Sequence, residues 1–420
     1  WLAMLEREHD NIAAAMRGAL TAGDADGAMR LAAYSGWYWW LAGHKVEGHR
    51  LLVAATTLSG RVPEEIRAVV YAFVTGFLTS GRGRDQYRAA DWIRKAAEIG
   101  RRVRIRHPAV SLAGPLERLL HGPEAFLSAF EPALDDEDPW VRALARLQRG
   151  KMRIVLGDGG RDADIDLETA LDEFRALGER WGMSFAFTEL ADRVAVRGAF
   201  ADACAYYEQA IAVVTDVGST EDLVRLRSRL AQLYWLAGDE AASAAAKAEA
   251  QRSAARVTWP EALVELALSK AELARWRGDA EQARRHLGAA TAVLGTEAEQ
   301  PSVRGLLDDM RGYLAEDLAA ARRHRRAAFD AVSGSEHAPQ IAQVLVGIAD
   351  LALREERYAQ AARLLAASAD VRGLPDRSHP DVARIERAAR THLGEARYAE
   401  AAREGVTTSW TELAAHTLAS

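Results

Sequence analysis

Four arginines in the middle of the sequence have the spacing of one helix face. They stand four, three and four residues apart, at Arg142, Arg146, Arg149 and Arg153, so a helix would place their guanidinium groups on one side. A guanidinium presents a planar fork of donors that fits carboxylates and phosphates. On the inner surface of a folded chain these arginines would bind an acidic peptide or a phosphorylated ligand. The alternative is pairing with acidic residues just downstream, or solvation, and the sequence leaves both interpretations open.

Four consecutive aromatic residues form a second cluster with recognisable chemistry. Trp37, Tyr38, Trp39 and Trp40 cover every side of one helical turn, so some rings are expected to be buried while at least one points elsewhere. If the rings are packed in the core near the beginning of the chain, their role is structural. A cage formed by Trp37, Trp39 and Trp40 would instead bind a ligand.

The remaining reactive residues lack the companions that catalysis needs. Cys204 is the only cysteine, which excludes an internal disulfide and a cysteine-rich zinc site and is typical of a reducing compartment. No histidine and asparagine pattern accompanies it, so a small buried hydrophobic residue is the favoured interpretation. The segment GDGGRDAD, which begins at Gly157, lacks the lysine of a phosphate-binding loop. We therefore expect no enzymatic activity and no cofactor.

Metal-binding patterns are not found in the sequence either. The eleven histidines are scattered, and the closest pair, His44 and His49, would point to different sides of a helix. An acidic stretch from Asp162 to Glu173 has the length of a calcium-binding loop. Leu167, however, stands where the sharp turn of such a loop needs glycine. We expect no metal site.

The elements that would position these residues repeat at a constant interval. In the segment RGAFADACAYYEQA, Gly198 occupies a turn and Phe200, Ala203 and Tyr207 follow on one helix face. Self-similarity at a period of about forty residues indicates a solenoid of helix pairs. In this frame an insertion of roughly eight residues would follow Gly157. The same turn position recurs at Gly238, Gly278, Glu316 and Glu356.

Helix starts can be assigned from the same frame. They are expected 38 to 41 residues apart, at Trp140, Trp181, Asp222, Pro260, Pro301 and Pro339. Prolines crowd the interval before Trp140, and because proline blocks the preceding helical turn, short or kinked helices are expected there. Earlier in the chain, a helix pair should run from about Glu64 to Ile99 with its turn at Gly81 or Gly83. A last helix should begin near Trp410.

Composition and charge narrow the class of protein. Hydrophobic residues make up 49% of the 420 residues, and segments such as AASAAAKAEA favour helix. The net charge of −6 argues against direct binding of nucleic acid. The longest apolar run, from Ala68 to Leu78, is too short to span a bilayer, so we expect no membrane association. A cytoplasmic location is expected from the reducing compartment that the single cysteine indicates. The chain begins at Trp1 without a methionine, which suggests a region of a longer protein.

The repeats and both ends of the chain resemble known families. Leu230, Ala231, Tyr234, Gly238 and Ala250 resemble the small and large residue code of tetratricopeptide repeats. The segments WLAMLEREHDNIAAAM at the start and RTHLGEARYAEAAREGVTTSWTELAAHTL at the finish are similar to the bounds of the C-terminal helical region in actinobacterial AfsR/SARP-type and MalT-like LuxR regulators. In those families the helical array senses an inducer or a partner. A DNA-binding domain and a STAND-type ATPase module belong to the same polypeptide.

The fold that we expect is an all-α, tetratricopeptide-like right-handed superhelical solenoid of about nine to ten helix pairs. It would run as one continuous array over residues 1–420, with a joint near residues 105–139, where the prolines gather.

The expected function is regulatory. The resemblance implies a ligand-sensing and protein-interaction region of a bacterial transcriptional regulator, with a protein partner or small effector in the concave groove and ATPase and DNA-binding modules in the same polypeptide. The alternative is a stand-alone tetratricopeptide scaffold that binds peptide partners in its groove. A nucleotide-binding module encoded next to this region would favour the first interpretation.

Overall fold

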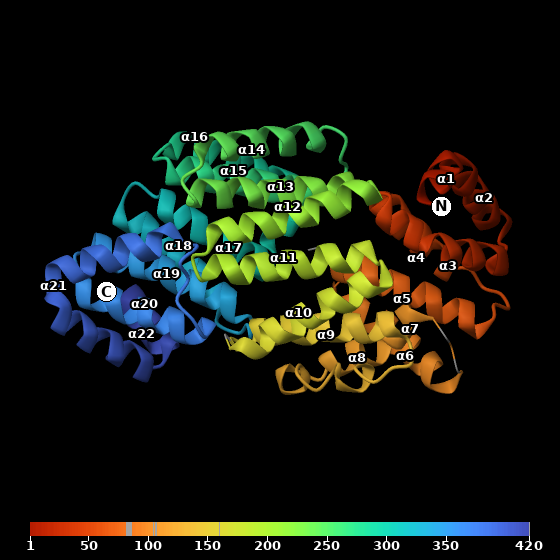
Figure 1. Cartoon of the computed structure of the whole chain (residues 1–420), viewed down its shortest axis with the longest axis horizontal. Coiled ribbons are helices and arrows are strands. Elements are labelled where there is room, and N and C mark those ends of the chain that lie inside the picture. Colours follow the sequence, from red (N-terminus) through yellow and green to blue (C-terminus); the bar gives the residue numbers. More distant parts are fainter. Residues whose placement is uncertain (81–85, 104, 106, 159, 420) are drawn as a thin grey trace.

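The protein is built from helices stacked one after another. The computed structural model describes residues 1–80, 86–103, 105, 107–158 and 160–419, and this part of the chain contains no β-strand. Figure 1 shows the helices stacked in chain order, with the N-terminal and C-terminal helices at opposite ends of the molecule. The prediction of an all-α solenoid is confirmed.

Six helices form the N-terminal part of the stack. Their bounds are α1 (Leu2–Arg7), α2 (His9–Ala22), α3 (Ala25–Leu41), α4 (Lys45–Thr56), α5 (Glu64–Ser80) and α6 (Gln86–Arg102). Asp24 caps α3, because its side chain accepts a hydrogen bond from the backbone N–H of Gly27 at 3.0 Å. The expected pair from Glu64 to Ile99 is confirmed as α5 and α6, while its expected turn at Gly81 or Gly83 lies outside the described residues.

A segment of short helices joins this part to the regular repeats. It contains α7 (Pro108–Ser111), α8 (Ala113–Leu119) and two 3-10 turns, Pro123–Ala125 and Glu131–Ala133. All four of these elements hold a proline in their first turns or interior, where the missing backbone donor prevents a long helix. The expectation of short helices before Trp140 is therefore confirmed, and the joint near residues 105–139 stays a prediction.

Six regular helix pairs follow. Their bounds are α9 (Pro139–Val155), α10 (Arg161–Leu177), α11 (Arg180–Val196), α12 (Phe200–Val217), α13 (Thr220–Leu236), α14 (Glu240–Ala254), α15 (Pro260–Trp276), α16 (Ala280–Leu294), a 3-10 turn (Gly295–Glu299), α17 (Pro301–Leu314), α18 (Leu318–Val332), α19 (Ala338–Arg354) and α20 (Tyr358–Arg372). The first helix of each pair begins within two residues of the start expected from the sequence. The insertion expected after Gly157 is wrong, because α10 already begins at Arg161 and contains the acidic stretch.

The turn between the helices of a pair has a recurring structure. Gly238 and Gly278 adopt left-handed backbone angles, with φ of 85° and 83°, which glycine tolerates without a steric cost. The aspartate after each glycine then caps the second helix, and Asp239 and Asp279 accept hydrogen bonds from backbone N–H groups at 2.8 and 2.9 Å. Glu356 keeps this conformation with φ of 60°.

The turn expected at Glu316 does not have this structure. Helix α17 ends at Leu314, and Ala315 continues in an extended conformation. Glu356 is the one non-glycine residue with positive φ in the described part of the chain, so Glu316 does not take the left-handed turn. The next helix begins from Asp317 instead, whose side chain accepts a hydrogen bond from the backbone N–H of Ala320 at 2.6 Å.

Two further elements complete the array. Helix α21 (Pro380–Thr407) consists of two helices that meet at Gly394, where φ is 75°. The final helix, α22 (Trp410–Ala419), begins where the sequence predicts. Its Leu413, Ala414 and Leu418 are buried in the same core as residues of α19 and α20.

The curved array brings distant repeats into contact. Helix α9 ends against α20, and a side chain on Gly157 would overlap the carbonyl oxygen of Val371. The loop after α20 reaches α11, where the backbone N–H of Arg377 donates to the carbonyl of Val196 at 2.8 Å. Arg275 on α15 pairs with Asp381 on α21 at 2.7 Å. The C-terminal repeats are thus fastened to the middle of the array.

The N-terminal helices also pack against the regular repeats. Trp37 on α3 makes ring contacts with Trp140 and Trp181 at the starts of α9 and α11, with centroids 6.1 and 5.6 Å apart. Lys45 at the start of α4 is buried, and its ammonium lies 3.4 Å from a carboxylate oxygen of Glu221 and 3.6 Å from one of Asp222 on α13. These contacts join the two parts through aromatic rings and one buried ion-pair cluster.

The Glu221 carboxyl should make stability depend on pH. Burial raises its pKa to about 7, because desolvation outweighs the attraction of Lys45. Its ordinary value is 4.5, so between these limits the folded chain holds a proton that the unfolded chain has released. This contribution to stability is fully present below pH 4.5 and is lost as the pH rises through about 7.

We expect Glu221→Gln to reduce the fall in stability between pH about 4.5 and 7. Urea unfolding at a series of pH values measures the free energy of unfolding and its change with pH. The exposed Glu240, replaced by glutamine, is the matched control and should leave the pH profile unchanged. A Glu221→Gln profile identical to that of the unsubstituted chain would contradict the assignment.

Candidate functional site

A cavity lies in the array, among the first helices of successive pairs. Its volume is about 800 Å³, within the range typical of ligand sites. The walls come from the first helices of successive pairs, α9, α11, α13, α15, α17 and α19, and from the loop that follows α20. Because that loop is fastened to Val196, the contact between distant repeats also shapes the cavity.

Charged side chains of both signs line this cavity in equal number. The cations are Lys151, Arg193, Arg225, Arg229 and Arg372, and the anions are Glu189, Asp192, Glu265, Glu272 and Asp376. Several form pairs across neighbouring helices, with Lys151 2.9 Å from Glu189 and Arg229 3.1 Å from Asp192. A balanced lining of this kind does not select a polyanion. It suits a ligand that carries both charges.

The cavity-lining Arg225 differs from the other arginines around it. In the described part of the chain it makes neither a hydrogen bond nor an ion pair. Burial lowers the pKa of Arg225, but the carboxylates of Glu265 and Asp222 outweigh this effect and raise it overall. The guanidinium therefore stays charged, with its five donors directed to no protein acceptor.

An apolar strip lies beside these charges. Leu268, Val303, Leu306 and Met310 line the cavity from α15 and α17. Trp276 adds its indole ring, which packs on Trp235 with centroids 5.1 Å apart. The indole N–H of Trp276 is buried and has no acceptor among the described residues. The cavity thus offers an apolar surface next to hydrogen-bond donors, the usual composition of a ligand pocket.

A buried ionic network supports one wall of the cavity. Arg325 on α18 pairs with Asp309 on α17, and both side chains are almost completely buried. Gln343, which lines the cavity, donates to the other oxygen of Asp309 at 3.2 Å. Two guanidinium groups contact the Tyr313 ring, with the central carbon of Arg325 3.9 Å and that of Arg275 4.3 Å from the ring centroid.

The network continues to α21. Burial raises the pKa of Asp381, but Arg275, His379 and Arg384 outweigh burial and lower it to about 2. Asp381 is therefore a carboxylate at neutral pH, and its pair with Arg275 joins α15 to the start of α21. The charges behind the cavity wall thus fix the positions of α17, α19 and α21.

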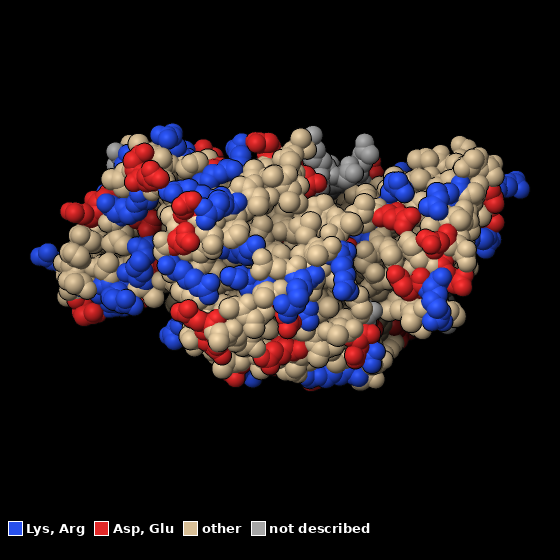
Figure 2. Space-filling model, turned by 90° about the horizontal axis from the view of Figure 1, so that it is seen from above, with Lys and Arg blue, Asp and Glu red and all other residues tan. Residues whose placement is uncertain are grey.

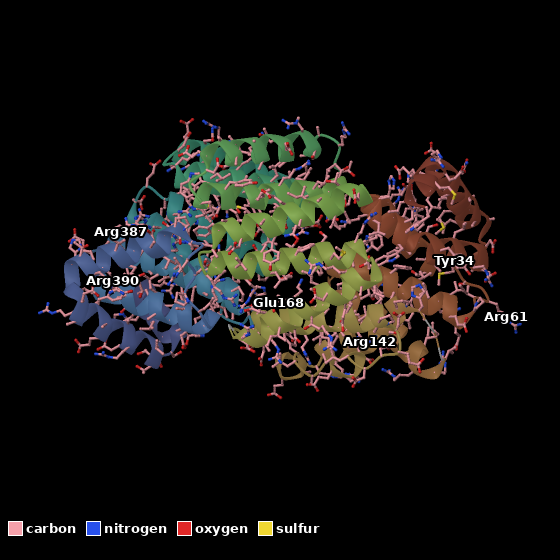
Figure 3. The ribbon with its side chains drawn as sticks, viewed as in Figure 1. Tyr34, Arg61, Arg142, Glu168, Arg387 and Arg390 are labelled. Atoms are coloured by element: carbon pink, nitrogen blue, oxygen red, sulfur yellow. The ribbon has the colours of Figure 1, made fainter. Side chains whose placement is uncertain are left out.

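The arginine stripe lies on α9 but does not line the cavity. Arg142 donates to the backbone carbonyl of Asp136 at 2.6 Å, and Figure 3 shows it at the edge of the array near the short helices. Arg146 pairs with Glu173, and Arg149 and Arg153 both pair with Asp166. Acidic residues of α10 therefore pair with three of the four arginines, and backbone carbonyls before α9 bind the fourth.

The aromatic run also lies away from the cavity. Trp39 is completely buried together with Tyr38, so it has no surface for a ligand. Trp37 and Trp40 are half-buried, and their rings contact Trp181 and Phe77 respectively. These rings join α3 to α5 and to the regular repeats. Cys204 is buried as expected, and burial raises the pKa of its thiol to about 11.

The residues that form the cavity wall were missed, although the sequence carries a signal for them. Polar residues recur on the first helices at intervals of forty: Glu189, Arg229 and Ser269 in one column, Asp192, Gln232 and Glu272 in a second, and Arg225 and Glu265 in a third. On a helix whose neighbours are apolar, polar residues at the repeat period indicate a shared inner surface.

The face that Figure 2 presents carries side chains of both charges. Lys and Arg side chains gather across the middle of this face, and Asp and Glu side chains lie between them and along its lower edge. None of the described helices combines the length and apolar composition that crossing a bilayer requires.

Comparisons with known proteins give structural neighbours only. No family model and no curated protein matches the sequence. A crystal structure of a Rap protein complexed with Competence and Sporulation Factor is similar, with a TM-score of 0.58 at 11% identity over 85% of this chain and 99% of that one. This similarity shows that the two chains share a fold.

Two further solved structures resemble the chain more weakly. A STAND protein with a tetratricopeptide repeat sensor from Pyrococcus horikoshii has a TM-score of 0.42 at 11% identity, covering 86% of this chain and 54% of that one. A human IFIT1 dimer with PPP-AAAA has a TM-score of 0.37 at 14% identity, covering 87% and 91% of the two chains.

Proposed function

We propose that the chain is a sensing region that binds a short peptide or a small effector of mixed charge in its central cavity. The observation that carries the proposal is Arg225, a charged guanidinium in the cavity lining with no hydrogen-bond or ion-pair partner in the described chain. A charged guanidinium whose donors no protein group occupies can form charge-assisted hydrogen bonds to a ligand. A carboxylate of the ligand would supply the acceptor, and the strip near Trp276 would take an apolar group.

The Rap protein that shares this fold was crystallised with Competence and Sporulation Factor, and this analogy supports an effector-binding role. The effector would act by preferring one curvature of the array, since the cavity wall includes contacts between repeats far apart in the chain. In the finer form of the proposal, the chain is the cytoplasmic sensor of a bacterial transcriptional regulator. ATPase and DNA-binding modules would then belong to the same polypeptide.

A stand-alone scaffold is the second candidate function. It is favoured by the balanced charges of the cavity, which would also suit a segment of a partner protein. The sequence of the full-length gene distinguishes the two, because only the regulator requires a nucleotide-binding module on the same polypeptide.

Replacement of Arg225 by glutamine should weaken ligand binding by about 10- to 100-fold, the worth of one charge-assisted hydrogen bond. The ligand would first be selected by native mass spectrometry from a library of short peptides with free C-termini. Affinity is then measured by calorimetry. Arg227→Gln is the matched control, because Arg227 lies on the same helix but pairs with Glu249 at 3.1 Å outside the cavity. Equal affinity of both variants would overturn this role of Arg225.

A further inference from the structure

Two imidazoles and two carboxylates meet at the N-terminal end of the molecule. They come from α1, the first residue of α2 and the start of α4: Glu6, His9, His44 and Glu47. The sequence gives no hint of this cluster, because the two histidines belong to different helices and neither has a metal-binding motif nearby. The proposed ligand-binding cavity is formed by other residues.

The four side chains already form two pairs. His9 Nε2 lies 3.1 Å from a carboxylate oxygen of Glu47, and His44 Nε2 lies 3.0 Å from one of Glu6. The two imidazole rings stack with centroids 3.8 Å apart. One ligand atom from each of His9, His44 and Glu47 lies within 4.8 Å of the others. Three ligand-type atoms from the starts of two helices, α2 and α4, thus lie close to one another.

Tyr38 holds this cluster in place from the protein interior. Its side chain is completely buried, and its hydroxyl donates to Glu6 at 2.9 Å and lies 3.0 Å from His9 Nδ1. A hydroxyl on Nδ1 orients the ring so that Nε2 points to Glu47. Outer groups of this kind position metal-ligating histidines and carboxylates in known sites. The cluster is therefore organised by a core residue.

We propose that Glu6, His9, His44 and Glu47 bind one Zn²⁺ ion. Imidazole nitrogens and carboxylate oxygens are ligands that Zn²⁺ takes in tetrahedral sites, with bonds of about 2.0–2.2 Å. Such bonds place neighbouring ligand atoms about 3.3 Å apart. The cluster would therefore contract by rotation of the partly exposed histidine side chains. Arg17, which lies 3.7 Å from Glu47 and is largely exposed, can move aside.

The bound ion would connect three helices. Glu6 and His9 lie on either side of the break between α1 and α2, while His44 and Glu47 begin α4. In the described structure these helices meet here through hydrogen bonds among partly exposed side chains. A metal would replace them with four bonds to one atom and fix α1 and α2 on the α3–α4 pair.

The test is a titration of the metal-free full chain with Zn²⁺ alone by isothermal calorimetry, repeated with Co²⁺ and visible absorption. We expect one ion per chain and the absorption of tetrahedral Co²⁺. The variant His9→Gln/His44→Gln should lose at least about 100-fold in affinity, since it removes two ligands. Tyr38→Phe, which changes only the positioning residue, should lose about 10- to 100-fold.

His392→Gln provides the matched control. His392 is an exposed histidine whose ring stacks on Tyr358, remote from the cluster, and its replacement should leave the affinity unchanged. Circular dichroism and thermal unfolding without metal must show that each variant is folded. A metal-free chain that binds no Zn²⁺ at one equivalent, or a folded His9→Gln/His44→Gln variant that keeps the full affinity, would overturn the proposal.

Discussion

Replacement of Asp309 by alanine is expected to lower the free energy of unfolding by about 3–5 kcal/mol, the usual cost of removing one partner from a buried ion pair. Arg325 would remain in the core without its carboxylate, because its side chain is completely buried. The second acid near it, Asp350, is 3.8 Å away and already accepts from Arg384. Urea unfolding measures the loss.

A second variant separates the effect of the buried charges on stability from the effect of side-chain volume. The double variant Asp309→Leu/Arg325→Met removes both charges and keeps apolar volume, so it should recover much of the lost stability. An exposed pair on α16 provides the control: Arg285→Met breaks the contact with Glu281 and should cost less than about 0.5 kcal/mol. If Asp309→Ala costs no more than Arg285→Met, the network does not support the fold.

Replacement of Gly157 by alanine should cause the second largest loss in the free energy of unfolding. The residue has φ of 80°, which costs an L-residue about 1–2 kcal/mol. A methyl group there would also overlap the carbonyl oxygen of Val371, which belongs to the backbone of α20 and cannot rotate away. We expect a total loss of about 2–4 kcal/mol, with α20 displaced from the end of α9.

The matched control is Gly238→Ala. Gly238 has φ of 85° but no atom within 4 Å of the added methyl group, so only the backbone cost of about 1–2 kcal/mol applies. The difference between the two variants isolates the contact with α20. Hydrogen exchange should show loss of protection near Arg377 for Gly157→Ala alone. Equal unfolding free energies and equal exchange in both variants would contradict the predicted role of the contact between Gly157 and α20.

The helices were predictable because each repeat carries its own local signals. Proline or a capping acid marks the first helix, as at Pro260 and Pro301, and a glycine followed by aspartate marks the turn to the second. These signals act over a few residues, so a period of forty makes them visible. Glu316 was assigned to the turn by period alone, without the glycine that causes the left-handed conformation, and there the prediction was wrong.

The cavity depends on contacts that no local signal encodes. Arg377 and Val196 meet only because the curvature of several repeats accumulates, and a sequence shows each repeat without its rotation relative to the next. The arginines on α9 illustrate the same limit. Their spacing correctly indicates one helix face, but whether that face meets α10 or the cavity depends on the rotation of α9, and it meets α10.

The contact between α9 and α20 changes how the protein should unfold. In an open array each repeat touches only its neighbours, so the terminal repeats can fray while the centre persists. Here the last repeats share contacts with α9, α11 and α15 at Gly157, Val196 and Arg275. Unfolding of the last repeats therefore also exposes residues in the middle of the chain. The regular repeats are therefore expected to melt in one cooperative transition, as a closed ring does and a chain of independent units does not.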